Sequence, residues 1–387
     1  MKLKDIANNS VIRKLARFVT SYFLLIVFAV ILIVWAITGT FQSLSAPSVK
    51  ELLSNSTVKN MELIQLTSSP DRKDYLLWSP DGTKLVYMKG YDVYVSNIML
   101  KTEQKITSWD EWGNYGLKLF SYSGNGSELY LYAMGDLWAI PVNGSGRIQI
   151  THNNSYNSYM EKFRSGKYAY FNYTGYPTEL WFVDLGKTNK PKLLASDLNC
   201  HPYSSLDLNP DGSEVVFSAE MAVTQHLQSS YKNLTGIWVI NSDGTNRRQI
   251  SNQFGSQLSW SPNSNKIAFL RDDELWFINP DGTGEEKVLT QALYIKYFKW
   301  SPDGSRIAYW ASPTIDGNCT SLWIIDLVAH TEIRVLNTAN TGVFGKDMSW
   351  NPDGNMIAFI TTGSPEEQGY AKEQVLLLKF ISDKPKN

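Results

Sequence analysis

Three of the four histidines are the residues whose chemistry points most directly to a reactive site. They are His152, His201 and His226, and each falls in a loop between predicted strands. An imidazole nitrogen is a common ligand of divalent metals, so three convergent histidines could hold a catalytic metal. None stands at the spacing of a motif such as His-Glu-x-x-His, and exposed polar loop residues are the alternative interpretation. We therefore predict no metal and no cofactor, and keep the three as candidate ligand-binding residues.

A second group of candidates is aromatic. The sequence SWDEWGNYG places Trp109, Trp112 and Tyr115 close together with two carboxylates between them, and Tyr294 and Tyr297 lie in or near a later loop. Exposed rings beside carboxylates suit the capture of a carbohydrate or a peptide. The alternative is that the rings fill the gap between neighbouring structural units. Trp109, Trp112 and Tyr115 are the aromatic candidates for ligand binding.

Other motifs that carry chemistry are missing from the sequence. The recurrent Asp-Gly pairs lack the alternating ligands D-x-[DN]-x-[DN]-G of a calcium loop, so turn formation explains them. We find no nucleophile–base motif and no phosphate-binding loop, and we predict no catalytic residue. The balance of 36 basic and 37 acidic residues gives no basic field, which argues against a nucleic-acid partner.

The elements that must position these candidates follow from a repeat. The Trp of WSPDG serves as a marker, and its equivalents are Trp78, Tyr122, Phe163, Leu208, Trp260, Trp300 and Trp350. Successive markers are 40 to 52 residues apart, and apolar residues alternate within each unit as in strands. A period of this length with four strands per unit is typical of a β-propeller blade. We predict an all-β, seven-bladed β-propeller, with six or eight blades as the alternatives if a degenerate unit is misread.

The closure of the ring is also predictable from the count of strands. Six units end in an outer strand, whereas the last unit stops at its third strand, residues 373–381. A strand of the missing type, residues 61–67, precedes the first unit. Because an open array would expose unpaired strand edges, we expect residues 61–67 to complete the last blade.

The quoted repeats resemble a known family. WSPDG, SPDGSRIAY and the pattern DLWxIxxDGxxxxQIT are similar to the repeats of TolB-type propellers, which are Trp-Asp-repeat-like and related to the propeller of prolyl-oligopeptidase enzymes. The resemblance covers about residues 60–380 and implies a propeller fold. The histidine arrangement also resembles that of propeller lyases acting on acidic sugars, in which histidines at the tunnel mouth work with a divalent metal.

The N-terminal region differs from the repeats. Residues 18–37 form an apolar run without charge, long enough to span a bilayer as a helix, and basic residues predominate before it. We predict a cytoplasmic basic segment (1–17), a single-pass transmembrane signal anchor (18–39), a linker (40–60) and a propeller (61–383) outside the cell or in the periplasm. A cleaved signal peptide is the alternative.

Taken together, these features favour a non-catalytic function. We expect a membrane-anchored extracytoplasmic platform that binds a protein, peptide or envelope polymer on its loop-rich face. The alternative is a lyase or glycosidase that acts on an acidic oligosaccharide at the tunnel mouth, with His152, His201 and His226 as its candidate residues. The sequence does not decide whether Cys200 and Cys319 form a disulfide.

Overall fold

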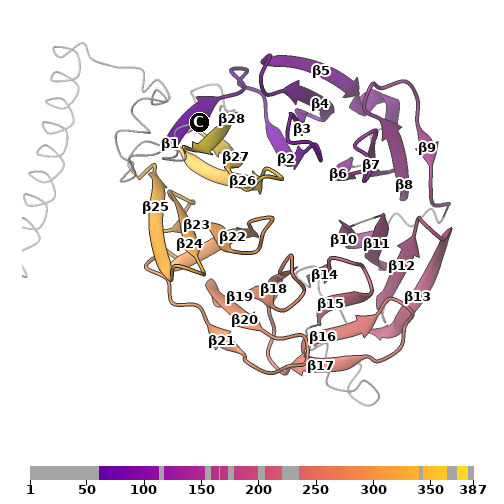
Figure 1. The fold of residues 1–387 in the computed structure, drawn as a ribbon. Coiled ribbons are helices and arrows are strands. Elements are labelled where there is room, and N and C mark those ends of the chain that lie inside the picture. Colours follow the sequence, from indigo (N-terminus) through magenta and orange to yellow (C-terminus); the bar gives the residue numbers. More distant parts are fainter. Residues whose placement is uncertain are drawn as a thin grey trace, which may run out of the picture. The chain divides into compact units, whose positions relative to one another are not determined.

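The described part of the chain folds into seven four-stranded antiparallel sheets arranged as the blades of a propeller (Figure 1). The computed structural model describes residues 61–112, 117–152, 158–164, 166–172, 178–198, 205–219, 235–339, 343–363 and 373–381. All of these belong to the second of the two units into which the chain divides, residues 46–387. The prediction of an all-β, seven-bladed propeller is confirmed.

Each blade runs from an inner strand to an outer strand in sequence order. Blade 1 comprises β2 (Lys73–Trp78), β3 (Lys84–Lys89), β4 (Asp92–Asn97) and β5 (Thr102–Thr107). Blade 2 comprises β6 (Lys118–Tyr122), β7 (Glu128–Ala133), β8 (Asp136–Pro141) and β9 (Ile148–Gln149). Blade 3 comprises β10 (Ser158–Arg164), β11 (Lys167–Asn172), β12 (Thr178–Asp184) and β13 (Thr188–Leu198). Blade 4 comprises β14 (Leu206–Leu208), β15 (Glu214–Ala219), β16 (Gly236–Asn241) and β17 (Arg248–Ser251). Blades 5 and 6 comprise β18 (Ser256–Trp260), β19 (Ile267–Arg271), β20 (Glu274–Ile278), β21 (Glu286–Lys287); and β22 (Tyr294–Trp300), β23 (Arg306–Ser312), β24 (Ser321–Asp326), β25 (Thr331–Asn337).

Blade 7 is built from both ends of the described chain. Its first three strands are β26 (Phe344–Trp350), β27 (Met356–Thr362) and β28 (Glu373–Phe380), and its outer strand is β1 (Met61–Gln65). β1 pairs antiparallel with β28 over its whole length. The prediction that the first strand completes the last blade is therefore confirmed, and the pairing covers the edge that β28 would otherwise expose.

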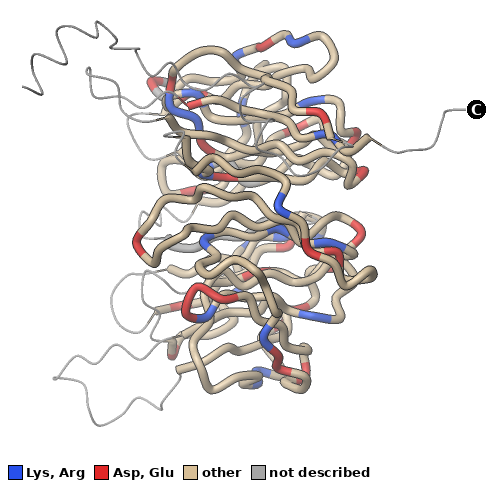
Figure 2. Tube along the Cα trace, turned by 90° about the vertical axis from the view of Figure 1, so that its left-hand side faces the viewer, with Lys and Arg blue, Asp and Glu red and all other residues tan. Residues whose placement is uncertain are grey.

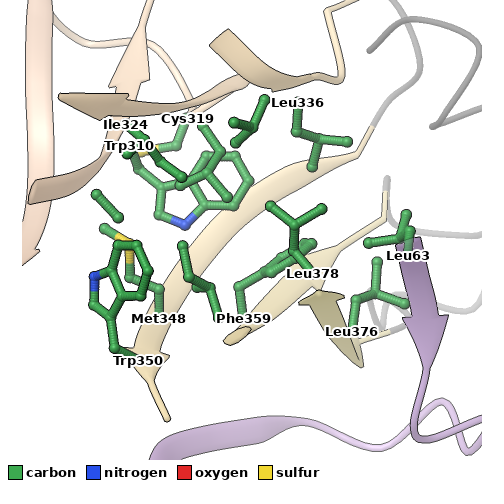
Figure 3. Close-up of a cluster of buried hydrophobic side chains, with 14 residues drawn as sticks. Leu63, Trp310, Cys319, Ile324, Leu336, Met348, Trp350, Phe359, Leu376 and Leu378 are labelled. Atoms are coloured by element: carbon green, nitrogen blue, oxygen red, sulfur yellow. The ribbon is translucent and has the colours of Figure 1, made fainter. Parts of the chain in front are cut away.

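The hydrophobic core is divided among the seams between blades. Seven clusters of buried side chains lie one in each seam, because alternate residues of a blade face the neighbour on either side. Figure 3 shows the seam between blades 6 and 7, where Trp310, Met348 and Phe359 pack together. Leu63 of β1 joins this cluster, so the closing strand also contributes to the core.

The recurrent turn between the first and second strands has its own hydrogen bonds. In blade 1, Ser79 Oγ donates to Asp81 Oδ1 and accepts the N–H of Lys84 at 2.9 Å. The N–H of Thr83 donates to the same carboxylate oxygen at 3.0 Å. These bonds lower the pKa of Asp81, the bond from Ser79 most of all. The Ser, Asp and Gly of the repeat thus fix the turn, as the sequence predicts.

The same turns also lock one blade to the next. A Cβ atom built on Gly82 of blade 1 would lie 3.6 Å from Cδ of Pro352 in blade 7, and one on Gly126 of blade 2 would lie 3.2 Å from Cδ of Pro80 in blade 1. The pairs Gly304–Pro262 and Gly354–Pro302 repeat the contact, at 3.3 and 3.6 Å. The turn glycine is thus packed against the proline of the preceding blade.

Two faces of the propeller follow from this topology. On the turn face, the residue after a third strand bonds to the turn between strands one and two, as in Ile98 N–H to Thr83 O at 3.0 Å. On the opposite side, which we name the loop face, the hairpins between strands two and three meet the connections that enter each blade, as in Gly90 N–H to Arg72 O at 2.7 Å. Basic and acidic residues are interspersed along the described chain, without a region of one sign (Figure 2).

The predicted segments 1–17, 18–39 and 40–60 lie outside the described residues. Within the described ranges, no helix has the length and apolar character needed to cross a membrane.

Candidate functional site: the central channel

The inner strands share a local irregularity that shapes the channel. In β2, β6, β10, β18, β22 and β26 the pairing register shifts near the start of the strand. Tyr75 and Gln257, at the shifts in β2 and β18, have left-handed backbone with φ of 56° and 52°. Such β-bulges turn a side chain out of the regular alternation. Both residues line the central cavity.

The central cavity has a volume of about 650 Å³ and is lined by inner strands of at least five blades. Its polar lining includes Tyr75, Arg164, Gln257, Lys299 and Asp347. Arg164 is fixed by a hydrogen bond of 2.8 Å from its guanidinium to the carbonyl of Leu208 in the next blade. The channel therefore offers aromatic, amide and charged groups on a rigid frame, which suits recognition of a polar ligand.

Two lysines are fixed at the bulges of β22 and β26, toward the loop-face ends of these inner strands. Lys296 Nζ donates to Asp273 Oδ2 at 2.7 Å and to the carbonyl of Ile315 at 2.6 Å. Lys346 Nζ lies 2.6 Å from Asp74 Oδ1 and 3.1 Å from Glu373 Oε1. Each ammonium is paired with carboxylates, so these lysines hold the loops together and present no isolated positive charge.

Two tyrosines expose their rings beside these bulges. Tyr75 is 38% exposed and Tyr297 is 44% exposed. Tyr297 lies within β22, next to Lys296, rather than in the loop before the blade. Partial burial raises the pKa of the Tyr297 phenol, with Cys319 and Asp347 adding to the shift, so it stays a neutral hydrogen-bonding group at neutral pH. A ring exposed at a rigid bulge is a ready surface for stacking.

The repeat tryptophans hold the inner strands in their places. The indole N–H of Trp350 donates to Lys299 O at 3.2 Å, and that of Trp300 donates to Ser259 O at 3.3 Å. In each case the acceptor precedes the repeat tryptophan of the preceding blade. At these two positions the repeat tryptophan thus links neighbouring inner strands around the channel.

The structure describes only some of the candidate residues predicted from the sequence. His152 is exposed in the connection that leaves blade 2 on the loop face. His201, His226 and Tyr115 lie outside the described residues, as does Cys200. The backbone of Trp109 lies in the 3₁₀-helix η1 (Trp109–Trp112), and its side chain is outside the described part. Only His152 of the three histidines is described, so their convergence stays a prediction.

Trp112 is placed in the core. Its side chain is fully buried, its indole N–H donates to Thr107 Oγ1 at 3.0 Å, and its ring meets that of Trp138 edge-on at 5.2 Å. The guanidinium of Arg147 lies 4.6 Å from the centre of the Trp112 ring. A fully buried ring has no face for a ligand, so Trp112 is a packing residue of the seam between blades 1 and 2. Ligand binding stays a prediction for Trp109 and Tyr115.

Sequence reasoning missed the channel residues Tyr75, Gln257 and Asp347. Each stands three positions before a repeat tryptophan, at Trp78, Trp260 and Trp350, so the repeat itself carried the signal. Among the described residues, no group of three or more His, Cys, Asp and Glu side chains is arranged to hold a metal ion.

Comparison with known proteins places the fold. The family described as "Dipeptidyl peptidase IV (DPP IV) N-terminal region" matches residues 46–117, less than half of the chain. None of the curated proteins matches. An oligogalacturonate lyase in complex with manganese has a TM-score of 0.63 at 16% identity, over 85% of this chain and 95% of that one.

Two further solved structures are similar. An oligogalacturonate lyase from Vibrio parahaemolyticus has a TM-score of 0.61 at 14% identity, over 84% of this chain and 95% of that one. A TolB structure from Agrobacterium tumefaciens has a TM-score of 0.47 at 12% identity, over 75% of this chain and 98% of that one, which is too low for any conclusion. These likenesses establish the fold alone.

Proposed function

We propose that the chain is a membrane-anchored, extracytoplasmic binding platform that takes a protein, peptide or envelope polymer at the mouth of its channel. The proposal depends mainly on one observation: the exposed ring of Tyr75 lines the polar cavity, and that of Tyr297 stands at the corresponding bulge of blade 6. Aromatic rings stack on the apolar faces of sugars and on peptide side chains, while neighbouring amides and carboxylates bond to their polar groups. No catalytic group is needed for this function.

The membrane part of the proposal depends on the sequence. The apolar run within residues 18–39 is long enough to span a bilayer, and the basic residues before it favour a cytoplasmic N-terminus. The propeller then lies outside the cell or in the periplasm, joined to the anchor by residues 40–60. No nucleic acid is expected as a partner, because the net formal charge is only −1.

The binding proposal is tested by calorimetric titration of the full chain in nanodiscs. The probes are defined neutral oligosaccharides, oligogalacturonate and short peptides. We expect Tyr75→Ala and Gln257→Ala to weaken binding of the ligand that the wild type takes, by about tenfold for loss of a stacked ring. Tyr91→Ala is the matched control, because Tyr91 is 57% exposed but is absent from the channel lining. Equal losses of affinity for Tyr75→Ala and Tyr91→Ala would show that the ligand does not bind at the channel.

A lyase that cleaves an acidic oligosaccharide is the second candidate function. It is favoured by the similarity in fold to two oligogalacturonate lyases and by the exposed position of His152 on the loop face. The test is incubation of the chain with oligogalacturonate and Mn²⁺, followed by the ultraviolet absorbance of an unsaturated product. Turnover that is lost in His152→Ala, His201→Ala or His226→Ala supports the enzyme. Binding without turnover supports the platform.

A further inference from the structure

Four large apolar side chains stand exposed on the turn face. They are at the tips of the connections that follow the third strands: Met99 is 87% exposed, Leu100 71%, Val328 77% and Ile381 51%. Met99, Val328 and Ile381 each come directly after a residue whose N–H bonds to the first turn of its blade. Their places on this face are thus fixed by the backbone.

These apolar tips occupy only three blades, and the three are adjacent. Met99 and Leu100 belong to blade 1, Val328 to blade 6 and Ile381 to blade 7. The corresponding turns of the other four blades are polar and exposed, with Asn143, Gly186, Asp243 and Asp281 at their tips. Within the turn face, this uneven distribution sets the sector of blades 6, 7 and 1 apart as a candidate interaction surface. The loop face carries exposed apolar side chains of its own, at Tyr91, Leu289, Leu293 and Ile315.

The chain enters the propeller at the middle of this sector. Met61 begins β1, the outer strand of blade 7, and pairs with Phe380, the residue before Ile381. Residues 1–60 are thus joined to the turn face, between the apolar tips of blades 6 and 1. A linker of this number of residues reaches only a few tens of ångströms as an unstructured chain, about 25 Å root-mean-square, so a propeller joined by residues 40–60 to a bilayer is expected to stay near that surface.

We propose that the turn-face sector formed by Met99, Leu100, Val328 and Ile381 docks on the phospholipid bilayer that holds residues 18–39. This inference rests on the anchor in the proposed function and adds an orientation to it. Apolar side chains at the tips of rigid turns insert at the boundary between headgroups and acyl chains. The linker makes this contact intramolecular in effect, so a few side chains are enough.

The charges beside the tips suit this partner. Exposed Lys101 follows Leu100, and exposed Lys379 stands two residues before Ile381. A lysine next to an inserted apolar residue can reach the phosphates while its methylene groups stay in the interface. In this orientation the loop face points away from the bilayer, whereas the turn residues Pro262 and Pro302, which line the central cavity, lie on the side of the bilayer.

The test uses the full chain in phosphatidylcholine nanodiscs that contain nitroxide-labelled lipid. Single cysteines for an environment-sensitive fluorophore are introduced as Met99→Cys or Val328→Cys, in a chain that carries Cys200→Ser and Cys319→Ala. Asn143→Cys and Asp243→Cys are the matched controls, because they place the label at the polar tips of the same face. We expect a blue shift and strong quenching at positions 99 and 328, and neither at positions 143 and 243.

The docking and the anchor can fail separately. Flotation of the chain with vesicles tests the anchor, and a chain that stays in solution overturns both proposals. A chain that floats but shows equal quenching at all four positions, or none, overturns the docking alone. A further variant with Met99→Ser, Leu100→Ser and Val328→Ser, all at exposed positions that leave the core intact, is expected to abolish quenching of a label at Ile381→Cys.

Discussion

The indole N–H of Trp78 donates a hydrogen bond of 3.0 Å to the carbonyl of Ser349, which lies 271 residues later in the sequence. This bond joins the inner strand of blade 1 to that of blade 7, across the point where the ring closes. We predict that Trp78→Phe lowers the free energy of unfolding by about 1–3 kcal/mol, because the partly buried carbonyl loses this donor. Urea unfolding of the purified chain measures the change.

Trp260→Phe is the control for this substitution. Trp260 occupies the same position in its repeat and is 1% exposed, but its indole N–H has no acceptor within the described ranges. Its replacement removes ring volume without breaking a bond to a carbonyl. A loss for Trp260→Phe as large as that for Trp78→Phe would show that ring volume, rather than the hydrogen bond, accounts for the effect.

Leu63 is the buried anchor of the closing strand, with 6% of its surface exposed in the seam between blades 6 and 7. We expect Leu63→Ala to cost about 2–5 kcal/mol in unfolding free energy, since it removes a packed side chain and leaves a cavity. Glu62→Ala, at the exposed neighbouring position of the same strand, should change it by less than about 0.5 kcal/mol. Similar small effects for both would mean that the ring does not depend on β1.

Lys73 is fully buried near the same closure, and its ammonium donates to the carbonyls of Ser69, Asp71 and Glu373 at 2.8, 2.7 and 2.7 Å. Burial lowers the pKa of Lys73 to about 8 from its ordinary value of 10.5. Between these two values the unfolded chain binds more protons than the folded chain, so stability rises with pH. We predict a gain on the order of 2 kcal/mol between about pH 8 and 10.

The variant Lys73→Met isolates this contribution. It has no group that titrates at position 73, so its stability should lack the part of the rise that the lysine supplies. The measurement is the urea midpoint of both chains across the pH range. Parallel pH profiles for the wild type and Lys73→Met would contradict the assignment, whatever their offset.

Gly124 stands in the turn of blade 2 at the position where other blades carry proline. A Cβ atom on Gly166, the turn glycine of blade 3, would have nothing within 4 Å, whereas Gly126 lies against Pro80. We predict that Gly124→Pro raises the unfolding free energy by about 0.4–1 kcal/mol, because it restricts the unfolded chain at a position where other blades carry proline. Gly124→Ala separates this effect from contact with Gly166. Destabilisation by Gly124→Pro would show that the turn of blade 2 differs from the others.

The architecture was predictable because the residues of the repeat directly determine the conformation of the backbone. Proline, aspartate and glycine at fixed places specify a turn, and alternating apolar residues specify strands, so the number of blades and the closure by residues 61–67 followed from counting. Because the pattern occurs seven times, the two units that match it least well could still be assigned as blades.

The candidate site was harder to predict from the sequence, because it depends on β-bulges and on contacts between blades. No propensity indicates that Tyr75 and Gln257 adopt positive φ, since a bulge is set by the fit of an inner strand against its neighbours. For the same reason the polar sequence around Trp112 suggested an aromatic ring exposed for ligand binding, whereas the Trp112 ring packs against Trp138 in the core. Long-range packing overrides local pattern at these positions.

The pairing of Met61 with Phe380 brings the two ends of the folded ring side by side. A short peptide could therefore join them, and new ends could be opened at an exposed connection between two blades, such as residues 289–293 between β21 and β22. The resulting circular permutant would keep every blade but would be made as one uninterrupted series of four-strand units. In the natural order, by contrast, β1 is synthesised before the other strands of the propeller, but it can pair only after β28 has been synthesised.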